Sequence, residues 1–191
     1  RGGGGKGIRI VNSPAELEKE FPLVSREAAL AFGDGSMYVE AYLPDARHIE
    51  VQVLADEHGS VLHFGTRECS LQRRNQKLVE EAPAPFLEDD VRVAMENTAV
   101  EIARRAGYTN AGTVEFLYKD GQYYFMEMNT RIQVEHPVTE GIYGVDIVKA
   151  QLQAALSHHL SIRQSDIIPR GHAIECRVNA ENVREGFRPT P

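Results

Sequence analysis

The dipeptide Asp120-Gly121 is the feature that most restricts how this chain can fold, because strand-like segments lie on both sides of it. The flanking segments are Thr113–Tyr118 and Gln122–Met128. An Asp-Gly dipeptide between two such segments is a strong signal for a β-hairpin. The sequence therefore predicts two antiparallel strands joined by a tight turn.

The length of that turn decides whether Glu115 and Glu127 share a face of the hairpin. A two-residue loop would pair residue 118 with 123 and place the two carboxylates on opposite faces. A three-residue loop, Lys119–Gly121 with a left-handed Gly121, would pair 118 with 122 and place them diagonally on one face. Diagonal carboxylates, with Cα atoms about 7–8 Å apart, can share Mg²⁺ or Mn²⁺. We favour this paired arrangement over two glutamates exposed separately to solvent.

Polar side chains occupy every odd position from residue 127 to 135: Glu127, Asn129, Arg131, Gln133 and Glu135. In an extended backbone they would share one face. The row indicates a metal at one end and a small anion at the other, with Arg131 as a planar fork for the anion. Glu135 would be a general base if burial raised its pKa. The alternative is a solvent-exposed edge strand with salt bridges.

Two other stretches suggest phosphate binding. The glycine run that includes Gly3, Gly4 and Gly5 leaves backbone N–H groups open to an anion, although Lys6 is not followed by the Ser or Thr of a P-loop. A flexible linker is the alternative. The segment Glu68–Lys77 concentrates basic residues in an acidic chain. It predicts contact with a polyanion such as a nucleotide phosphate, the alternative being an ordinary exposed loop.

The remaining patterns predict an α+β fold, because strands and helices mix without strict alternation. A helix is expected to begin at Ser13, capped by its side chain, with Glu16 closing a capping box. The strand His48–Ala55 should have one solvated face. Further helices are expected over 25–32, 86–106 and 145–156, and further strands over 8–11, 37–43, 61–64 and 172–178.

Composition excludes several classes of function. With 21 Lys and Arg against 28 Asp and Glu among 191 residues, the net charge is −7, so the chain is a poor general binder of nucleic acid. It has no run of 18 apolar residues and no signal-peptide pattern, so we expect no membrane span. Cys69 and Cys176 do not form a Cys-x-x-Cys motif and are expected to be reduced thiols.

These residues together resemble the biotin carboxylase component of biotin-dependent carboxylases, which has the ATP-grasp fold. The resemblance runs through nearly all 191 residues. Its most specific motifs are Arg47–Gln52, Gln72–Lys77 with Glu80–Pro83, and Glu127–Glu140. The last motif is more similar to the corresponding component of an acyl-CoA carboxylase than to a pyruvate carboxylase.

The resemblance implies a partial lid subdomain at residues 1–43, with the glycine loop and a hinge, and a central antiparallel-sheet catalytic subdomain at 44–191. Because the chain begins without Met and stops soon after an apparent strand, we expect an internal piece of a longer enzyme, with an incomplete lid and an incomplete C-terminal end. We also expect this piece alone to turn over little or no bicarbonate.

The implied reaction converts ATP and bicarbonate to carboxyphosphate and ADP, and the carboxyl group then passes to biotin on a carrier protein. The cofactors would be ATP and Mg²⁺ or Mn²⁺, with biotin as the carrier-bound substrate. The partners would be a biotin carboxyl carrier and a carboxyltransferase, with a homodimer possible in the full-length parent. The cytoplasm would be the location, or the mitochondrial matrix in a eukaryote.

The resemblance also implies individual roles. Glu115, Glu127 and Asn129 match metal ligands, and Arg131, Gln133 and Val134 match the bicarbonate pocket. Glu135 matches the base that deprotonates bicarbonate, Arg177 the residue that stabilises the biotin enolate, and Lys77 a basic residue near the phosphates. Nucleotide contacts would fall to Gly3, Gly4, Gly5, Glu40, Leu43, His48, Gln72, Asn75 and Leu117. Ala41 and Asn75 depart from the usual family residues.

Two alternatives stay open. One is another ATP-grasp ligase that forms an acyl phosphate on a different acid, although Arg131, Gln133 and Glu135 together with Arg177 speak against it. The other is a nucleotide-binding module without catalysis. Calorimetry with Mg-ATP would test for the module, and stimulation of ADP release by biotin with bicarbonate would separate the two enzymes.

Overall fold

The structure is a computed structural model that describes residues 8–73 and 75–190. The predicted phosphate contacts at Gly3, Gly4 and Gly5 lie outside the described residues. The chain divides into two compact units, which are described separately. The first comprises Arg1–Pro44 with Arg73–Gln76, and the second comprises Asp45–Gln72 with Lys77–Pro191. The assignment of residues 1–43 to a lid and 44–191 to a catalytic subdomain stays a prediction.

The first unit contains one helix, α1 (Pro14–Phe32), within its described part. Ser13 caps it by accepting a hydrogen bond from the Glu16 N–H at 3.2 Å, as predicted. The helix ends at Gly33, whose φ of 73° gives a left-handed cap. The separate helix predicted at 25–32 is wrong, because α1 continues through Pro22. The strands predicted at 8–11 and 37–43 are also wrong, since that backbone forms neither strand nor helix.

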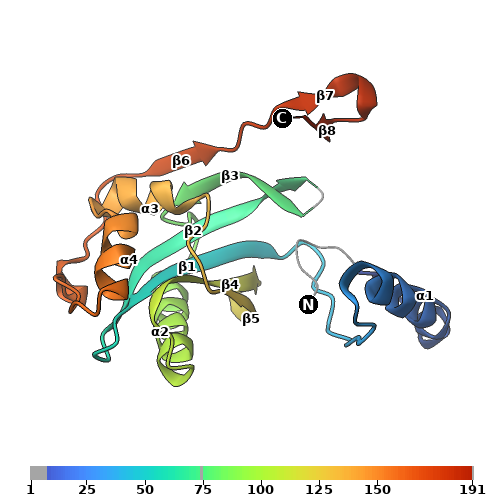
Figure 1. Ribbon diagram of the computed structural model, residues 1–191, viewed down its shortest axis with the longest axis horizontal. Helices are drawn as coiled ribbons and strands as arrows, with labels where there is room; N and C mark the ends of the chain where they lie inside the picture. The colour runs from blue at the N-terminus through green and yellow to red at the C-terminus, as the bar shows by residue number, and fades with distance from the viewer. Residues whose placement is uncertain (1–7, 74, 191) are drawn as a thin grey trace. The chain divides into compact units, whose positions relative to one another are not determined.

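The second unit is built on a six-stranded sheet in the order β5-β4-β1-β2-β3-β6 (Figure 1). The pairs β1–β2, β1–β4, β4–β5 and β3–β6 are antiparallel. The strand β2 is much longer than the predicted strand at 61–64. It includes residues 68–73 of the basic segment. The bounds are β1 (Arg47–Ala55), β2 (Val61–Arg73), β3 (Gln76–Ala82), β4 (Asn110–Lys119), β5 (Gln122–Asn129) and β6 (Ala173–Cys176).

Three helices accompany the sheet: α2 (Asp89–Arg105), α3 (His136–Tyr143) and α4 (Ile147–Ala155). Helix α2 carries acids in its first turn and arginines in its last turn, as the sequence predicts. Helix α3 is additional to the predicted elements. Towards the C-terminus, β7 (Glu181–Asn182) pairs with β8 (Arg188–Pro189), and short 3₁₀ turns cover 164–166 and 183–185.

The two faces of β1 are both buried, but one is apolar and the other is polar. On one face, Ile49 and Val51 of β1 pack with Met95 and Ala99 of α2 in an apolar core. On the other face, Glu50 and Gln52 have no exposed surface. The predicted solvated face of this strand is therefore wrong. Local alternation cannot reveal that the segment 133–139 covers this face, as its contacts with Arg67 show.

None of the helices in the described ranges is both long enough and apolar enough to cross a membrane.

Candidate functional site

A row of charged side chains crosses four neighbouring strands of the sheet. Glu127 on β5 is the cross-strand partner of Glu115 on β4, and Glu115 is the partner of Glu50 on β1. Glu50 is in turn the partner of Arg67 on β2. Partners in antiparallel strands share a face, so three carboxylates and one guanidinium form a single line. An adjacent line holds Asn129, Thr113 and Gln52.

The hairpin reaches this register by a route that differs from the predicted one. Asp120 and Gly121 both have positive φ, 51° and 78°, and Tyr118 pairs with Tyr123 across a two-residue turn. The predicted three-residue loop is therefore wrong. A register shift between Glu115 and Phe116 adds one residue, Met126, to β5. This bulge brings Glu127 directly opposite Glu115, so the two carboxylates share a face.

Arg67 is fully buried and occupies the centre of the polar face. Its Nε donates to Glu50 Oε1 at 2.5 Å, and Nη1 donates to Gln52 at 2.8 Å and to Thr139 at 2.9 Å. Its Nη2 donates to Thr113 and Gln133, both at 3.2 Å. A guanidinium has five N–H donors, so these bonds satisfy all of them. Arg67 thereby connects three strands with the segment that covers them.

Lys77 on β3 brings a second cation to the carboxylates. Its Nζ lies 2.8 Å from both Glu115 Oε1 and Glu135 Oε1, and it also donates to Glu50. Burial alone would raise the pKa of Glu50, but Arg67 and Lys77 outweigh it and hold that pKa below its usual value. Burial would lower the pKa of Lys77, but Glu50 and its neighbours raise it. Glu50 and Lys77 are therefore both charged at neutral pH.

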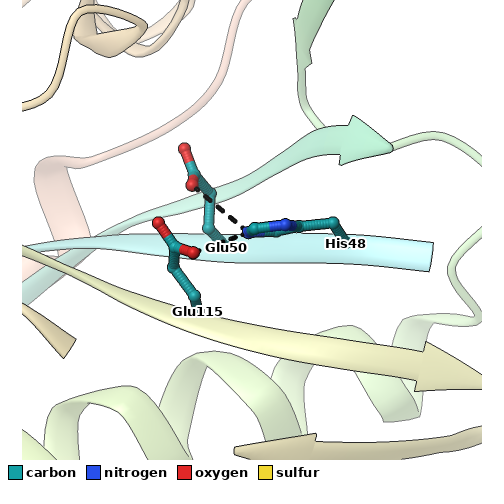
Figure 2. Close-up of side chains that lie close together, drawn as sticks. All are labelled: His48, Glu50 and Glu115. Carbon is teal, nitrogen blue, oxygen red and sulfur yellow. Dashed lines mark ion pairs between the residues drawn. The ribbon is translucent and has the colours of Figure 1, made fainter. Parts of the chain in front are cut away.

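Glu115 accepts from most of the polar groups around it. Its Oε1 receives Gln133 at 2.7 Å, Lys77 at 2.8 Å and Asn129 at 2.9 Å. His48 Nε2 lies 2.8 Å from Glu115 Oε2 and 4.0 Å from Glu50, and Figure 2 shows the imidazole directed at both carboxylates. Burial alone would raise the pKa of Glu115. The hydrogen bonds and positive charge of His48 and Lys77 outweigh burial and lower this pKa to about 2.

The oxygen donors predicted for a metal ion lie together at the β4–β5 edge. Asn129 Nδ2 lies 2.9 Å from Glu115 and 3.5 Å from Glu127, so it links the two carboxylates and leaves its own carbonyl oxygen available. Glu127 is exposed. Two carboxylates and an amide oxygen suit a hard cation such as Mg²⁺. A second cluster, Glu50, Cys69 and Glu135, fits a metal less well, because burial raises the pKa of Cys69 and keeps it a thiol.

The predicted extended row does not continue beyond β5. The backbone turns at residues 130–135 and enters α3 at His136. Gln133 and Glu135 are nevertheless buried over the polar face. Arg131 instead is exposed and donates to the carbonyl of Ile132 at 3.2 Å, and Val134 is 59% exposed. The structure therefore brings Gln133 into the cluster but leaves Arg131 and Val134 towards solvent.

Glu135 connects the cluster to β6. Its Oε1 lies 2.8 Å from Lys77, and its Oε2 lies 3.4 Å from Arg177 Nη2. Arg177 follows directly after β6, and its backbone N–H donates to the carbonyl of Leu78 at 2.8 Å. Glu135, the predicted base, thus contacts both Lys77 and Arg177.

The predicted nucleotide contacts divide between the two units. In the second unit, Gln72 Nε2 lies 2.9 Å from His48 Nδ1, and Leu117 is the cross-strand partner of His48. These three residues are neighbours at one end of the polar face. Glu40, Leu43 and Asn75 belong to the first unit. Glu40 and Leu43 lie in a segment without helix or strand, and Asn75 has a positive φ of 61°.

Several residues that hold the cluster together have no role among the sequence-based predictions. They are Glu50, Gln52, Arg67, Thr113 and Thr139, all buried. The alternation of Glu50 and Gln52 with apolar residues is a signal, but by itself it predicts a solvated face. Arg67 can be linked to Glu50 only with the register of β1 and β2 in hand.

Comparison with known proteins agrees with this geometry. The family model "Carbamoyl-phosphate synthase L chain, ATP binding domain" matches residues 1–163. The chain is 54% identical over 191 residues to the chloroplastic biotin carboxylase of Arabidopsis thaliana, covering 100% of this chain and 36% of that protein. It is 52% identical over 192 residues to biotin carboxylase 1 of Bacillus subtilis, covering 100% of this chain and 43% of that protein.

A pyruvate carboxylase component matches equally well. The chain is 55% identical over 190 residues to a subunit of the pyruvate carboxylase of Methanothermobacter thermautotrophicus, covering 100% of this chain and 39% of that protein. Relatives of both carboxylase types are thus almost equally similar to this chain. The preference for an acyl-CoA carboxylase therefore stays a prediction.

A solved structure shows the same fold. It is the biotin carboxylase domain dimer of Hydrogenobacter thermophilus 2-oxoglutarate carboxylase with MgADP, ADP and bicarbonate. The TM-score is 0.92 at 50% identity, covering 98% of this chain and 42% of that one. This chain thus spans about two fifths of the length of its relatives.

The predicted resemblance and the α+β ATP-grasp fold are confirmed. The chain belongs to the family of the carbamoyl-phosphate synthase L chain ATP-binding domain, and within it is similar along its whole length to biotin carboxylases.

Proposed function

We propose that this chain carries the nucleotide- and bicarbonate-handling residues of a biotin carboxylase. The observation that supports this most directly is the contact of Glu135 with both Lys77 and Arg177, next to the row of Glu127, Glu115 and Glu50. A base between two cations, beside hard-cation ligands, suits the deprotonation of a small oxyanion near a phosphate. The solved relative with MgADP and bicarbonate adds support.

In this proposal Glu135 accepts the proton of bicarbonate. Lys77, 2.8 Å away, stabilises the carboxylate that accepts it and adds positive charge near the phosphates. Gln133 is held at one end by Arg67 and at the other by Glu115, so its amide is fixed for bicarbonate binding. Arg177 binds the anionic form of the biotin ring, and Arg131 contributes the planar fork for bicarbonate.

Glu115, Glu127 and the carbonyl of Asn129 would hold Mg²⁺ or Mn²⁺, which when bound neutralises phosphate charge. His48, Gln72 and Leu117 would contact the nucleotide. Glu40, Leu43 and Asn75 stay predicted nucleotide contacts. Arg67 holds Glu50 and Gln133 in place without a role in the chemistry.

The proposed partners are a biotin carboxyl carrier and a carboxyltransferase, and the proposed assembly is a homodimer of the longer protein. Support comes from the pyruvate carboxylase relative and from the relative solved as a biotin carboxylase domain dimer. The proposed location is the cytoplasm or the matrix of an organelle, and the chloroplastic relative extends that proposal to plastids.

Calorimetry of Mg-ATP binding to the chain tests the site. Glu127 is exposed and its hydrogen bond with Asn129 is long, at 3.5 Å, so Glu127→Gln should leave the fold intact. We expect this variant to lose at least about tenfold of the affinity gained on adding Mg²⁺. Glu185→Gln, also at an exposed carboxylate, is the matched control and should match the parent. Equal Mg²⁺ dependence in the two variants would contradict the assignment of Glu127.

A further inference from the structure

A cluster of buried polar atoms without hydrogen-bond partners lies beside Arg177. Six such side-chain atoms occur among the described residues, and four of them belong to this cluster. They are both carboxyl oxygens of Glu80, Oε2 of Glu175 and Nε of Arg177. Buried polar groups in native proteins nearly always have partners, so this concentration requires an explanation.

The three residues share one face of the β3–β6 ribbon. Glu80 and Glu175 are direct cross-strand partners, and Glu80 has no exposed surface. Arg177 lies two residues after Glu175 and therefore points to the same side. Its guanidinium reaches Glu135 only loosely, at 3.4 Å. Two carboxyl groups and a guanidinium thus lie on one side of the ribbon, with Glu80 fully buried, Glu175 and Arg177 partly buried, and Arg177 in contact with the proposed base.

Two opposed carboxyl groups, of which Glu80 is fully buried and Glu175 partly buried, cannot both ionise without an electrostatic cost. A shared proton removes that cost and also supplies the missing donor. Burial, followed by Glu135 and Glu175, raises the pKa of Glu80 to about 7, and Glu50 acts in the same direction. Arg177 opposes that rise. Burial and Glu135 raise the pKa of Glu175, against Arg177, His136 and Arg67.

We propose that Glu80 and Glu175 share one proton at neutral pH, and that this pair positions Arg177 opposite Glu135. With the proton bound, the pair carries one negative charge. The pair and Glu135 then both attract the guanidinium of Arg177. Loss of the proton adds a second negative charge and draws the guanidinium away from Glu135. The shared proton does not depend on the function proposed above. The relevance of Arg177 and Glu135 to biotin carboxylation does rest on that function.

Nuclear magnetic resonance of the chain tests the pair directly. With ¹³C-labelled glutamate and ¹⁵N-labelled arginine, we expect a carboxyl resonance of the pair to titrate with a midpoint near 7, following the raised pKa of Glu80. The Nε resonance of Arg177 should shift with the same midpoint. Glu80→Gln should make the Arg177 resonance independent of pH in this range. Glu175→Gln should instead move the Glu80 midpoint back towards 4.5. Carboxyl midpoints that both lie below about 5, or an Arg177 resonance that ignores pH in the parent, would overturn the proposal.

Stability gives a second readout. A carboxyl group with a raised pKa in the folded state contributes stability below its unfolded pKa, and that contribution is lost as the pH rises through the folded value. Glu80→Gln should therefore gain stability relative to the parent as the pH rises through about 7. Glu185→Gln, at an exposed carboxylate outside the β3–β6 ribbon, is the matched control. A stability difference for Glu80→Gln that does not change with pH would indicate a purely packing role and overturn the proposal.

The two hypotheses can fail separately. A shared proton in a chain that binds no Mg-ATP would uphold the pair and count against the proposed function. Mg²⁺-dependent nucleotide binding without the titration near 7 would support the proposed function and overturn the shared proton.

Discussion

Arg67 illustrates at the residue scale how a charged side chain can be buried in a sheet. Each of its five N–H donors has a partner, and the carboxylate of Glu50 balances its charge. A buried charge without such partners would cost several kcal/mol. Arg67 and Glu50 therefore depend on each other, and both determine where Gln133 lies.

Replacement of Arg67 should leave the carboxylate of Glu50 short of positive charge in a dry interior. We expect Arg67→Met to lower the free energy of unfolding by about 3–5 kcal/mol, measured by urea denaturation. The double variant Glu50→Gln/Arg67→Met should recover part of this loss, because it removes the uncompensated charge. The control Arg105→Met, at a side chain that is 80% exposed, should cost several-fold less. Equal losses for Arg67→Met and Arg105→Met would contradict this account.

The β4–β5 hairpin shows at the element scale how one inserted residue sets the register of the site. The two-residue turn alone would oppose Glu115 with Met126. The bulge shifts that pairing by one residue, and Glu127 takes the place opposite Glu115. Because β5 is an edge strand, the bulge disturbs only one neighbour.

Two changes at the bulge test this register. Deletion of Met126 should convert the bulge to regular pairing with Glu127 still opposite Glu115, so Mg²⁺-dependent nucleotide binding should persist. Insertion of one alanine between Met126 and Glu127 should turn the Glu127 carboxylate to the other face and abolish that dependence. Circular dichroism serves as the control for folding. If the deletion abolishes the Mg²⁺ dependence and the insertion preserves it, the assigned register is wrong.

The described sheet of the second unit separates two kinds of interior. The face towards α2 is apolar, and the opposite face is a network of buried carboxylates, amides and cations. The network is enclosed around Arg67, but Arg131 and Val134, which are proposed to bind bicarbonate, are exposed. Chemistry that forms a water-labile intermediate needs water to be excluded there.

This openness gives a prediction for the whole chain. We expect the 191 residues to bind Mg-ATP but to release little or no ADP in a bicarbonate-dependent manner. The measurement is the rate of ADP formation with and without bicarbonate and biotin. Calorimetry on the same preparation distinguishes loss of turnover from loss of nucleotide binding. A clear bicarbonate-dependent rate would contradict the expectation.

Local residue patterns were sufficient to predict the hairpin around Asp120-Gly121 and the capped start of α1, and the resemblance of longer motifs indicated the family. They also brought Glu115, Glu127 and Glu135 to attention as candidate site residues, and the family resemblance added Lys77 to them. Local patterns could not predict the bulge at Met126, because strand register depends on the pairing between two segments.

Burial of the polar face of β1 became visible only in the folded chain. Alternation along β1 identifies two faces, but the segment that covers the second face comes from residues 133–139, far along the chain. The same distant packing fixes Arg67 among its five partners and places Glu80 opposite Glu175. Burial and charge pairing are properties of contacts between remote segments, which a single sequence does not display.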